Sequence, residues 1–181
     1  MPKNPNPYKN CPSFESKHFM LRLVQIEDAD DLIICYSDPK AQVLFNIDNF
    51  PADCRYKTVE EMLGCIDFWL TEYAGEAYIR FCIVDKSSGK AVGTIEMFGM
   101  VGAYKVDPGI LRIDIASNYE HTPYLDELLN ICSENFYDLF GVSNIVTKAI
   151  PQANNRINAL TAAGFHPCDF NGRAHYYLRT K

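Results

Sequence analysis

Apolar and polar positions alternate in steps of two along several stretches of the chain, the pattern of β-strands. These runs are rich in β-branched and aromatic residues and are bounded by turn-forming residues. The short polar segment 86–90 lies between two of them and predicts a hairpin. The runs predict strands at residues 19–24, 78–85, 91–100, 110–116 and 145–150, and a closing strand pair between 168 and 178.

Between these runs the apolar spacing changes to three and four residues, which is the spacing of an amphipathic helix. Acidic residues at 27–31 suit a helix N-terminus, and Thr58 with Glu61 forms a capping-box signature. Gly141 and Gly164 follow the last apolar positions of two later helices and predict where they end. The spacing predicts helices at about 27–36, 58–73, 124–140 and 154–163.

The predicted order is a strand, two helices, three strands, a helix, a strand, a helix and one or two closing strands. This order combines hairpins with crossover connections, so the fold class is mixed α/β, with α+β character. Residues 19–181 show no linker or repeat and are predicted to form a single domain. Residues 1–18 are predicted to be a mobile arm, and the turn formers of 46–56 predict a loop.

Composition agrees with one soluble domain, because 48% of the 181 residues are hydrophobic and 22% are charged. The longest apolar runs are only a few residues, whereas a bilayer span needs roughly 20, so we expect no membrane segment. Seven widely spaced cysteines, an odd number without a Cys-x-x-Cys pair, predict a reduced, cytoplasmic setting. The four histidines lack ligand spacing, so no metal site is expected.

The net charge of −6 is spread along the chain without a basic cluster longer than a residue or two. This pattern argues against binding a nucleic-acid backbone. It favours attraction of a basic or neutral small substrate.

Three passages have the order and spacing of a known family. The first is 19–22 followed by 27–29, the second is 91–95, and the third is 159–160 closing on 163–165. Over about residues 19–180 the chain resembles the GNAT superfamily of acetyl-CoA-dependent N-acetyltransferases, especially the branch that acetylates ribosomal-protein N-termini. The resemblance implies a mixed, mostly antiparallel sheet of six to seven strands flanked by about four helices. It also implies acetyl-CoA as co-substrate and an amine as acceptor.

In that family, the strand that corresponds to 110–116 leads into a glycine-rich loop whose amides hold the cofactor pyrophosphate at a helix N-terminus. Here His121 and Pro123 stand in place of the two glycines, and Glu120 stands where a positive residue is usual. The other interpretation of the segment is a helix that Thr122 caps, with Pro123 in its first position. The cofactor-binding residues that the resemblance implies are Ile115, Ala116, Ser117, His121, Thr122, Tyr124, Asn154 and Asn155.

Direct acetyl transfer to an amine requires a base, for which a carboxylate on a strand is suited. Glu96 and Asp114 are the candidates, since each lies within an apolar strand. Alternation places Arg112 on the same face as Asp114, so a structural ion pair is the other interpretation of Asp114. Leu160 occupies the position of the family's usual aromatic acid. Tyr119 or Tyr137 is the candidate to replace it, and the other interpretation of either tyrosine is an ordinary packed aromatic.

The sequence thus predicts an acyltransferase that moves an acetyl group from acetyl-CoA directly to the amine of a small molecule or a peptide N-terminus. The alternative is a catalytically inactive GNAT-fold module that binds a ligand or peptide, because the loop lacks its glycines. Aromatic residues make up 13% of the chain, and Phe50, Tyr104 and Tyr176 are candidates for exposed side chains that would permit a homodimer.

Overall fold

The computed structural model describes residues 6–46, 48, 56–101 and 104–181. It contains a single eight-stranded sheet with the strand order β1-β2-β3-β4-β5-β6-β8-β7. The strands are β1 (Phe14–Glu15), β2 (Phe19–Leu23), β3 (Ile79–Asp85), β4 (Lys90–Val101), β5 (Tyr104–Ile115), β6 (Asn144–Lys148), β7 (His166–Phe170) and β8 (Arg173–Thr180). The helices are α1 (Ala29–Tyr36), α2 (Pro39–Gln42), α3 (Val59–Ala74), α4 (Thr122–Phe140) and α5 (Asn154–Ala162), with 3-10 turns η1 (Ile26–Asp28) and η2 (Ser117–Tyr119).

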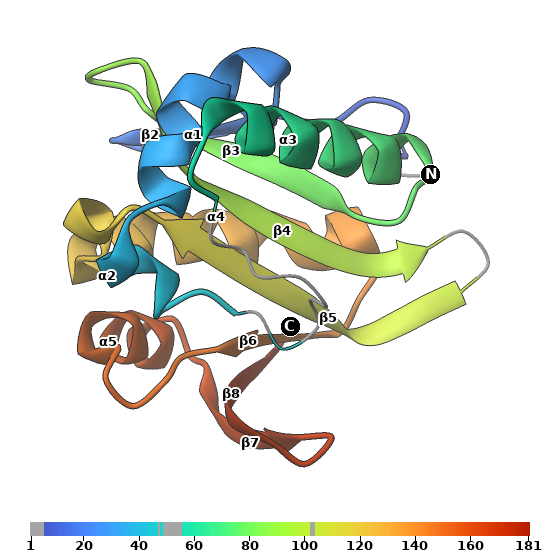
Figure 1. The fold of residues 1–181 in the computed structure, drawn as a ribbon. Coiled ribbons are helices and arrows are strands. Elements are labelled where there is room, and N and C mark those ends of the chain that lie inside the picture. Colours follow the sequence, from blue (N-terminus) through green and yellow to red (C-terminus); the bar gives the residue numbers. More distant parts are fainter. Residues whose placement is uncertain (1–5, 47, 49–55, 102–103) are drawn as a thin grey trace.

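Helices cover both faces of the sheet (Figure 1). One core lies between α4 and the apolar side chains of β2 to β5, among them Phe81, Ile95 and Ile113. The second core lies beneath α1 and α3, where Tyr36 and Trp69 are buried. Successive strand residues therefore contribute to opposite cores, as the two-residue alternation predicted.

The mixed α/β class and the predicted long elements are confirmed. The strand count is higher than predicted, because residues 14–15, within the expected arm, pair with β2. Tyr8, Cys11 and Phe14 also pack against the α4 core. α2 was not predicted, and β5 begins six residues before the expected start at Ile110. Most of the predicted loop at 46–56 lies outside the described residues.

Local sequence signals explain several boundaries. The Thr58 hydroxyl accepts from the Glu61 amide while the Glu61 side chain accepts from the Thr58 amide, so α3 begins with a complete capping box. α4 ends where Gly141 adopts φ 62°, a left-handed conformation that glycine adopts without steric cost. None of the described helices combines the length and apolar character needed to cross a bilayer.

The close approach of β4 and β5 depends on a second glycine. A Cβ atom built on Gly93 would lie 2.3 Å from the Asp114 carbonyl oxygen and 2.7 Å from the Ile115 Cα. No other residue type fits this position without moving the backbone. Gly93 belongs to the 91–95 passage that carries the family resemblance, and it holds Asp114 close against β4.

β5 and β6 are the parallel pair in this sheet. Their ladder consists of Gly109 opposite Ile145 and Ile110 opposite Val146, although β5 continues to Ile115 and β6 to Lys148. β6 pairs along its whole length with β8 on its other side. The end of β5 thus leads, beyond this short ladder, into the loop before α4.

Candidate active site

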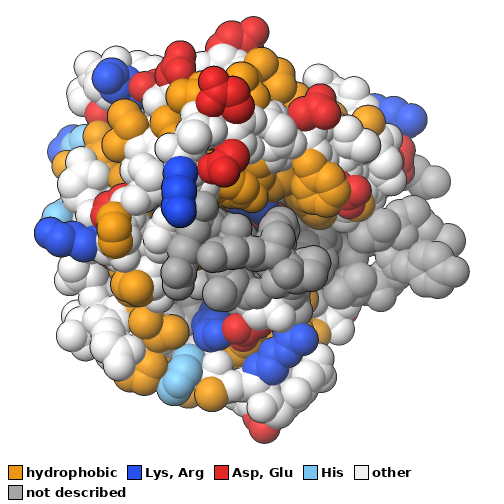
Figure 2. All heavy atoms as spheres, in the orientation of Figure 1, with side chains coloured by type: hydrophobic (Ala, Val, Ile, Leu, Met, Phe, Trp, Pro, Cys, Tyr) orange, Lys and Arg blue, Asp and Glu red, His pale blue; other side chains and the backbone are white. Residues whose placement is uncertain are grey.

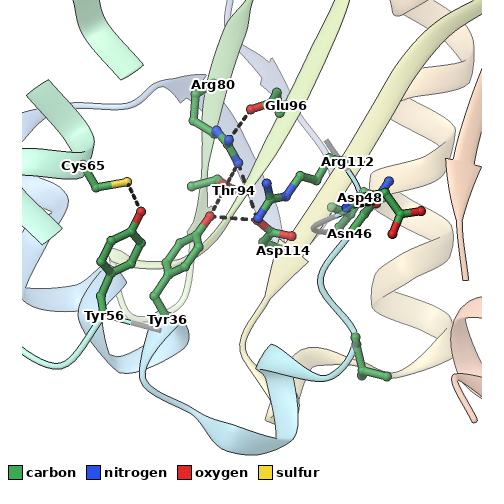
Figure 3. A network of polar contacts seen from close by, with 12 residues as sticks. Tyr36, Asn46, Asp48, Tyr56, Cys65, Arg80, Thr94, Glu96, Arg112 and Asp114 are labelled. Carbon is green, nitrogen blue, oxygen red and sulfur yellow. Dashed lines mark hydrogen bonds and ion pairs between the residues drawn. The ribbon is translucent and has the colours of Figure 1, made fainter. Parts of the chain in front are cut away.

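Charged and polar side chains form two rows across the middle of the sheet, on the face that α1 and α3 cover (Figure 3). Arg80, Glu96 and Arg112 occupy paired positions on β3, β4 and β5, so positive and negative charges alternate across three strands. In the neighbouring row, Thr94 on β4 pairs with Asp114 on β5. All five residues are buried, and the two arginines balance the two carboxylates.

The arginines connect these rows. Arg80 forms an ion pair with Glu96, and its Nη1 donates to Thr94 Oγ1 over 3.2 Å. Arg112 Nη2 lies 2.7 Å from Asp114 Oδ2, and Arg80 Nη1 lies 3.5 Å from the same oxygen. Opposite charges and hydrogen bonds together make burial of four ionised groups tolerable.

Aromatic residues from α1 and α3 close this network from above. The Tyr36 hydroxyl donates to Asp114 Oδ2 over 3.1 Å and lies 2.7 Å from Thr94 Oγ1. Burial, and then the nearby Asp114 charge, raise the Tyr36 pKa well above its usual value, so this hydroxyl keeps its proton. The Arg80 guanidinium lies 4.3 Å from the centre of the Trp69 ring, within cation–π range.

The two candidate bases differ in their surroundings. Asp114 is fully buried and contacts Tyr36, Arg80 and Arg112, as the structural interpretation of this residue predicted. Glu96 has 9% of its surface exposed and forms an ion pair with Arg80. Glu96 is therefore the more exposed of the two carboxylates.

Sequence reasoning did not identify Arg80, Tyr36 or Thr94 as members of this site. Arg80 had a visible signal, because it is a charged residue inside the apolar run that became β3. Thr94 and Tyr36 carried none, since a threonine in a strand and a tyrosine in a helix are ordinary.

Tyr119, the candidate acid, does not lie beside the two rows of charged and polar side chains. Its hydroxyl donates to Asp85 Oδ2 over 3.0 Å, at the end of β3. Asp85 is five positions along β3 from Arg80, which corresponds to roughly 16 Å at the usual rise of a strand. Burial, followed by the contact with Asp85, raises the Tyr119 pKa to about 12. The structure does not bring Tyr119 together with Glu96.

A second polar group ties the segment after α2 to the closing strands. Asn46 Nδ2 donates to the Tyr176 hydroxyl, which in turn donates to Asp48 Oδ2, both over 3.3 Å. Lys148 on β6 forms an ion pair with Asp48. Tyr176 is 1% exposed, so its predicted exposure is wrong; Phe50 and the Tyr104 side chain lie outside the description.

The loop that should hold the cofactor pyrophosphate uses most of its amides internally. Ala116 N donates to Val92 O over 2.9 Å, which continues the β4–β5 ladder. Ser117 N donates to Asp38 Oδ2 over 3.2 Å, and Tyr119 N to Ala116 O over 2.8 Å. Glu120 N and His121 N donate to carbonyls of η2. Five backbone amides between residues 116 and 121 thus already donate hydrogen bonds within the protein.

The start of α4 differs from its prediction. His121 is the N-cap and makes no side-chain cap bond, so the predicted cap at Thr122 is wrong. Thr122 is instead the first helical residue, and Pro123 follows it in the first turn without an amide hydrogen. Tyr124 packs its ring against Phe19 at a centroid distance of 5.5 Å, as a core residue would.

The loop before α4 and the start of α5 lie side by side. Two hydrogen bonds join them: Asn155 Nδ2 donates to Glu120 O over 2.8 Å, and Thr122 Oγ1 donates to Asn155 O over 3.5 Å. Arg156 makes two bonds of 2.8 Å to the Glu120 carboxylate. Asn154 is exposed at the first helical position.

These contacts test whether the loop suits the diphosphate of coenzyme A. Its amides are largely occupied, Pro123 lacks a donor, and the Asp38 carboxylate accepts from the Ser117 amide. Arg156, the cation that reaches the loop, is neutralised by Glu120. In the arrangement described, these residues do not fit a diphosphate. Among the residues that the structure describes, no group of three or more His, Cys, Asp or Glu side chains is placed to hold a metal ion.

Comparison with known proteins gives one consistent result. No protein-family profile matches the sequence, and no curated protein matches it. Solved structures do match the fold over almost the whole chain. A ribosomal-protein-S5-alanine acetyltransferase from Vibrio fischeri is 18% identical, with a TM-score of 0.68 and coverage of 93% of this chain and 96% of the other.

Two further structures agree with it. A GNAT-family acetyltransferase from Bacillus anthracis is 13% identical, with a TM-score of 0.68 and coverage of 93% and 98%. RimJ from Mycobacterium smegmatis, in complex with CoA-disulfide, is 16% identical, with a TM-score of 0.70 and coverage of 90% and 81%. The chain therefore has the fold of the GNAT acetyltransferases, and this prediction is confirmed.

Proposed function

We propose that this protein is a GNAT-type acyltransferase that moves an acetyl group from acetyl-CoA to the amine of a small molecule or a peptide N-terminus. The fold supports the proposal, because the solved structures that match this chain over nearly its full length include acetyltransferases. The site adds a carboxylate, Glu96, at the middle of the sheet.

The acceptor chemistry follows from the charged rows. An amine must lose a proton before or during attack on a thioester, and Glu96 is the carboxylate we assign to this step. Asp114 forms an ion pair with Arg112 and accepts a hydrogen bond from Tyr36, and in this proposal it is a positioning residue. Tyr119 is likewise assigned a positioning role, since its hydroxyl is bound to Asp85.

The surface charge favours a cationic acceptor. Figure 2 shows Asp and Glu side chains spread over α1 and α3, the helices that cover the charged rows. On these two helices, Asp30, Glu60 and Glu61 are exposed. Together with a net charge of −6, this face attracts a protonated amine more readily than an anion.

Calorimetric titration with acetyl-CoA and with CoA, followed by an acetylation screen of amines, tests the proposal. We expect binding of both cofactors and acetyl transfer to at least one cationic amine. Absence of binding at millimolar cofactor, with a correctly folded protein, would contradict the acyltransferase proposal.

A second candidate function has an observation of its own. The loop amides donate within the protein, and each candidate base is paired with arginine, which is what a GNAT-fold binding module without catalysis would show. This module would bind an amine or a peptide but no CoA. Thermal-shift screening with amines alone and with CoA alone separates the two functions, since both respond to an amine and only the acyltransferase responds to CoA.

A further inference from the structure

The first turn of α4 has few amides to offer to an anionic ligand. A helix start normally attracts an anion through its free amides and the positive end of its dipole. In this chain Tyr124 N turns back and donates to His121 O over 3.1 Å, and Pro123 has no amide hydrogen. Since five loop amides before it also donate within the protein, at most Asn118 N and Thr122 N remain for an anion.

The charges around this helix start are negative or already paired. The Asp38 carboxylate accepts from the Ser117 amide over 3.2 Å. Arg156 donates both of its paired bonds to the Glu120 carboxylate, so its charge is neutralised. Farther along α4, burial raises the pKa of Glu127, but hydrogen bonds from residues 16 and 18 outweigh burial and lower it. A diphosphate placed here would meet carboxylates instead of cations.

The starts of α1 and α3 do not attract an anion either. The first turn of α1 contains Asp30 and Asp31, and that of α3 contains Glu60 and Glu61. These acidic residues occupy the positive end of each helix dipole. The whole chain carries a net charge of −6 as well. A polyanionic nucleotide therefore gains no attraction from the overall charge of this protein.

We infer that this protein recognises its acyl donor without using a diphosphate, so that a short, neutral thioester serves as well as acetyl-CoA. The inference rests on the proposed function, since it concerns the donor of the same reaction. Acetyl-CoA remains a donor, because it carries the same thioester. A thioester without the nucleotide avoids bringing phosphates toward Asp38 and the other carboxylates near α4. The donor class is thus an acyl thioester, with S-acetyl-pantetheine as the simplest close analogue of acetyl-CoA.

Steady-state kinetics with two donors and one amine acceptor tests the inference. The donors are acetyl-CoA and S-acetyl-pantetheine, which lacks the nucleotide and its diphosphate. Even one hydrogen bond between the protein and a charged group is worth about tenfold or more. We therefore expect kcat/KM for acetyl-CoA to exceed that for S-acetyl-pantetheine by less than about tenfold. A larger preference for acetyl-CoA overturns the inference.

Salt dependence gives a second readout. If the protein held the diphosphate by charge, the KM for acetyl-CoA would rise as salt screens the attraction. The net negative charge instead repels the nucleotide, so this KM should stay constant or fall between roughly 0.05 and 0.5 M salt. S-acetyl-pantetheine is uncharged, and its KM is the matched control that should not change. A rise in KM for acetyl-CoA alone overturns the inference.

Calorimetric titration with ADP adds a readout that does not depend on activity. ADP carries a diphosphate but no thioester, and we expect no saturable binding at millimolar concentration. Saturable ADP binding, like a strong preference for acetyl-CoA, overturns the inference and leaves the acyltransferase proposal standing. Absence of acetyl transfer from both thioesters to every amine tested, with a correctly folded protein, overturns the acyltransferase proposal and the inference with it.

Discussion

Arg80 shows how one residue joins the fold to the candidate site. It lies on a strand whose neighbouring positions, Ile79 and Phe81, face the opposite core, while its own side chain is 1% exposed. Glu96, Thr94 and Trp69 each contact its guanidinium. A charge is buried here because several partners replace its water.

Replacing Arg80 should therefore destabilise the protein strongly. Arg80→Met leaves the Glu96 charge without its partner, and loss of one member of a buried pair costs about 3 to 5 kcal/mol. Urea unfolding followed by circular dichroism measures this change in the free energy of unfolding. Lys86→Met, which removes an exposed ion pair with Glu15, is the matched control and should cost less than about 1 kcal/mol.

A second pair of variants distinguishes the role of Glu96 from that of Asp114. In an active enzyme, Glu96→Gln should lower kcat by roughly 10² to 10⁴-fold, the usual contribution of a general base. Asp114→Asn should mainly lower stability, because Arg112 and Tyr36 lose their charged partner. Steady-state kinetics and thermal unfolding of both variants check this assignment. A large kcat loss in Asp114→Asn at unchanged stability would reverse it.

At the scale of elements, the spacing between β4 and β5 depends on Gly93. Gly93→Ala would place a methyl group against the backbone of Asp114 and Ile115, which has little freedom to move. We expect a loss of about 1 to 3 kcal/mol or more, as for other overpacked positions, measured by urea unfolding. Gly64→Ala, on α3 with no atom within 4 Å of the added group, should be neutral or stabilising.

The link between the β3–β4 hairpin and η2 should respond to acid. Burial raises the Asp85 pKa, but hydrogen bonds from Ser87, Ser88 and Tyr119 outweigh it and lower the pKa from 3.8 to about 2. A carboxyl with a lowered pKa stabilises the folded state above its unfolded pKa, and this contribution is lost as the pH falls toward 2. Urea midpoints between pH 5 and 2 should fall less steeply for Asp85→Asn than for the wild type. Parallel curves would contradict this role.

At the scale of the whole molecule, the N-terminal segment contributes to the main core. The Phe14 ring lies 6.0 Å from the Phe81 ring and 5.9 Å from the Phe136 ring, so it connects β1, β3 and α4. Phe14 is half-buried, and Phe14→Ala should cost about 1 to 3 kcal/mol, less than a fully buried phenylalanine. Thermal unfolding checks it, and an unchanged transition would mean that the segment adds no stability.

Periodicity and end signals were enough to predict the long elements. The capping box at Thr58, the helix end at Gly141 and the alternation along β3 and β4 each depend on residues close in sequence. Short elements such as α2 and β1 escaped prediction, because two to four residues carry too little pattern. Their pairing depends on contacts with distant parts of the chain.

The sequence by itself determined the fold class and the face on which each strand residue lies, because these follow from local periodicity. It placed Arg112 and Asp114 on one face of a strand, and the structure then decided that they form an ion pair. Only the tertiary structure decided that Arg80 joins Glu96, that Asp85 takes the Tyr119 hydroxyl and that Arg156 meets Glu120. Each of these contacts joins residues on different elements. Their partners are chosen by how the sheet and helices pack, which no single stretch of sequence contains.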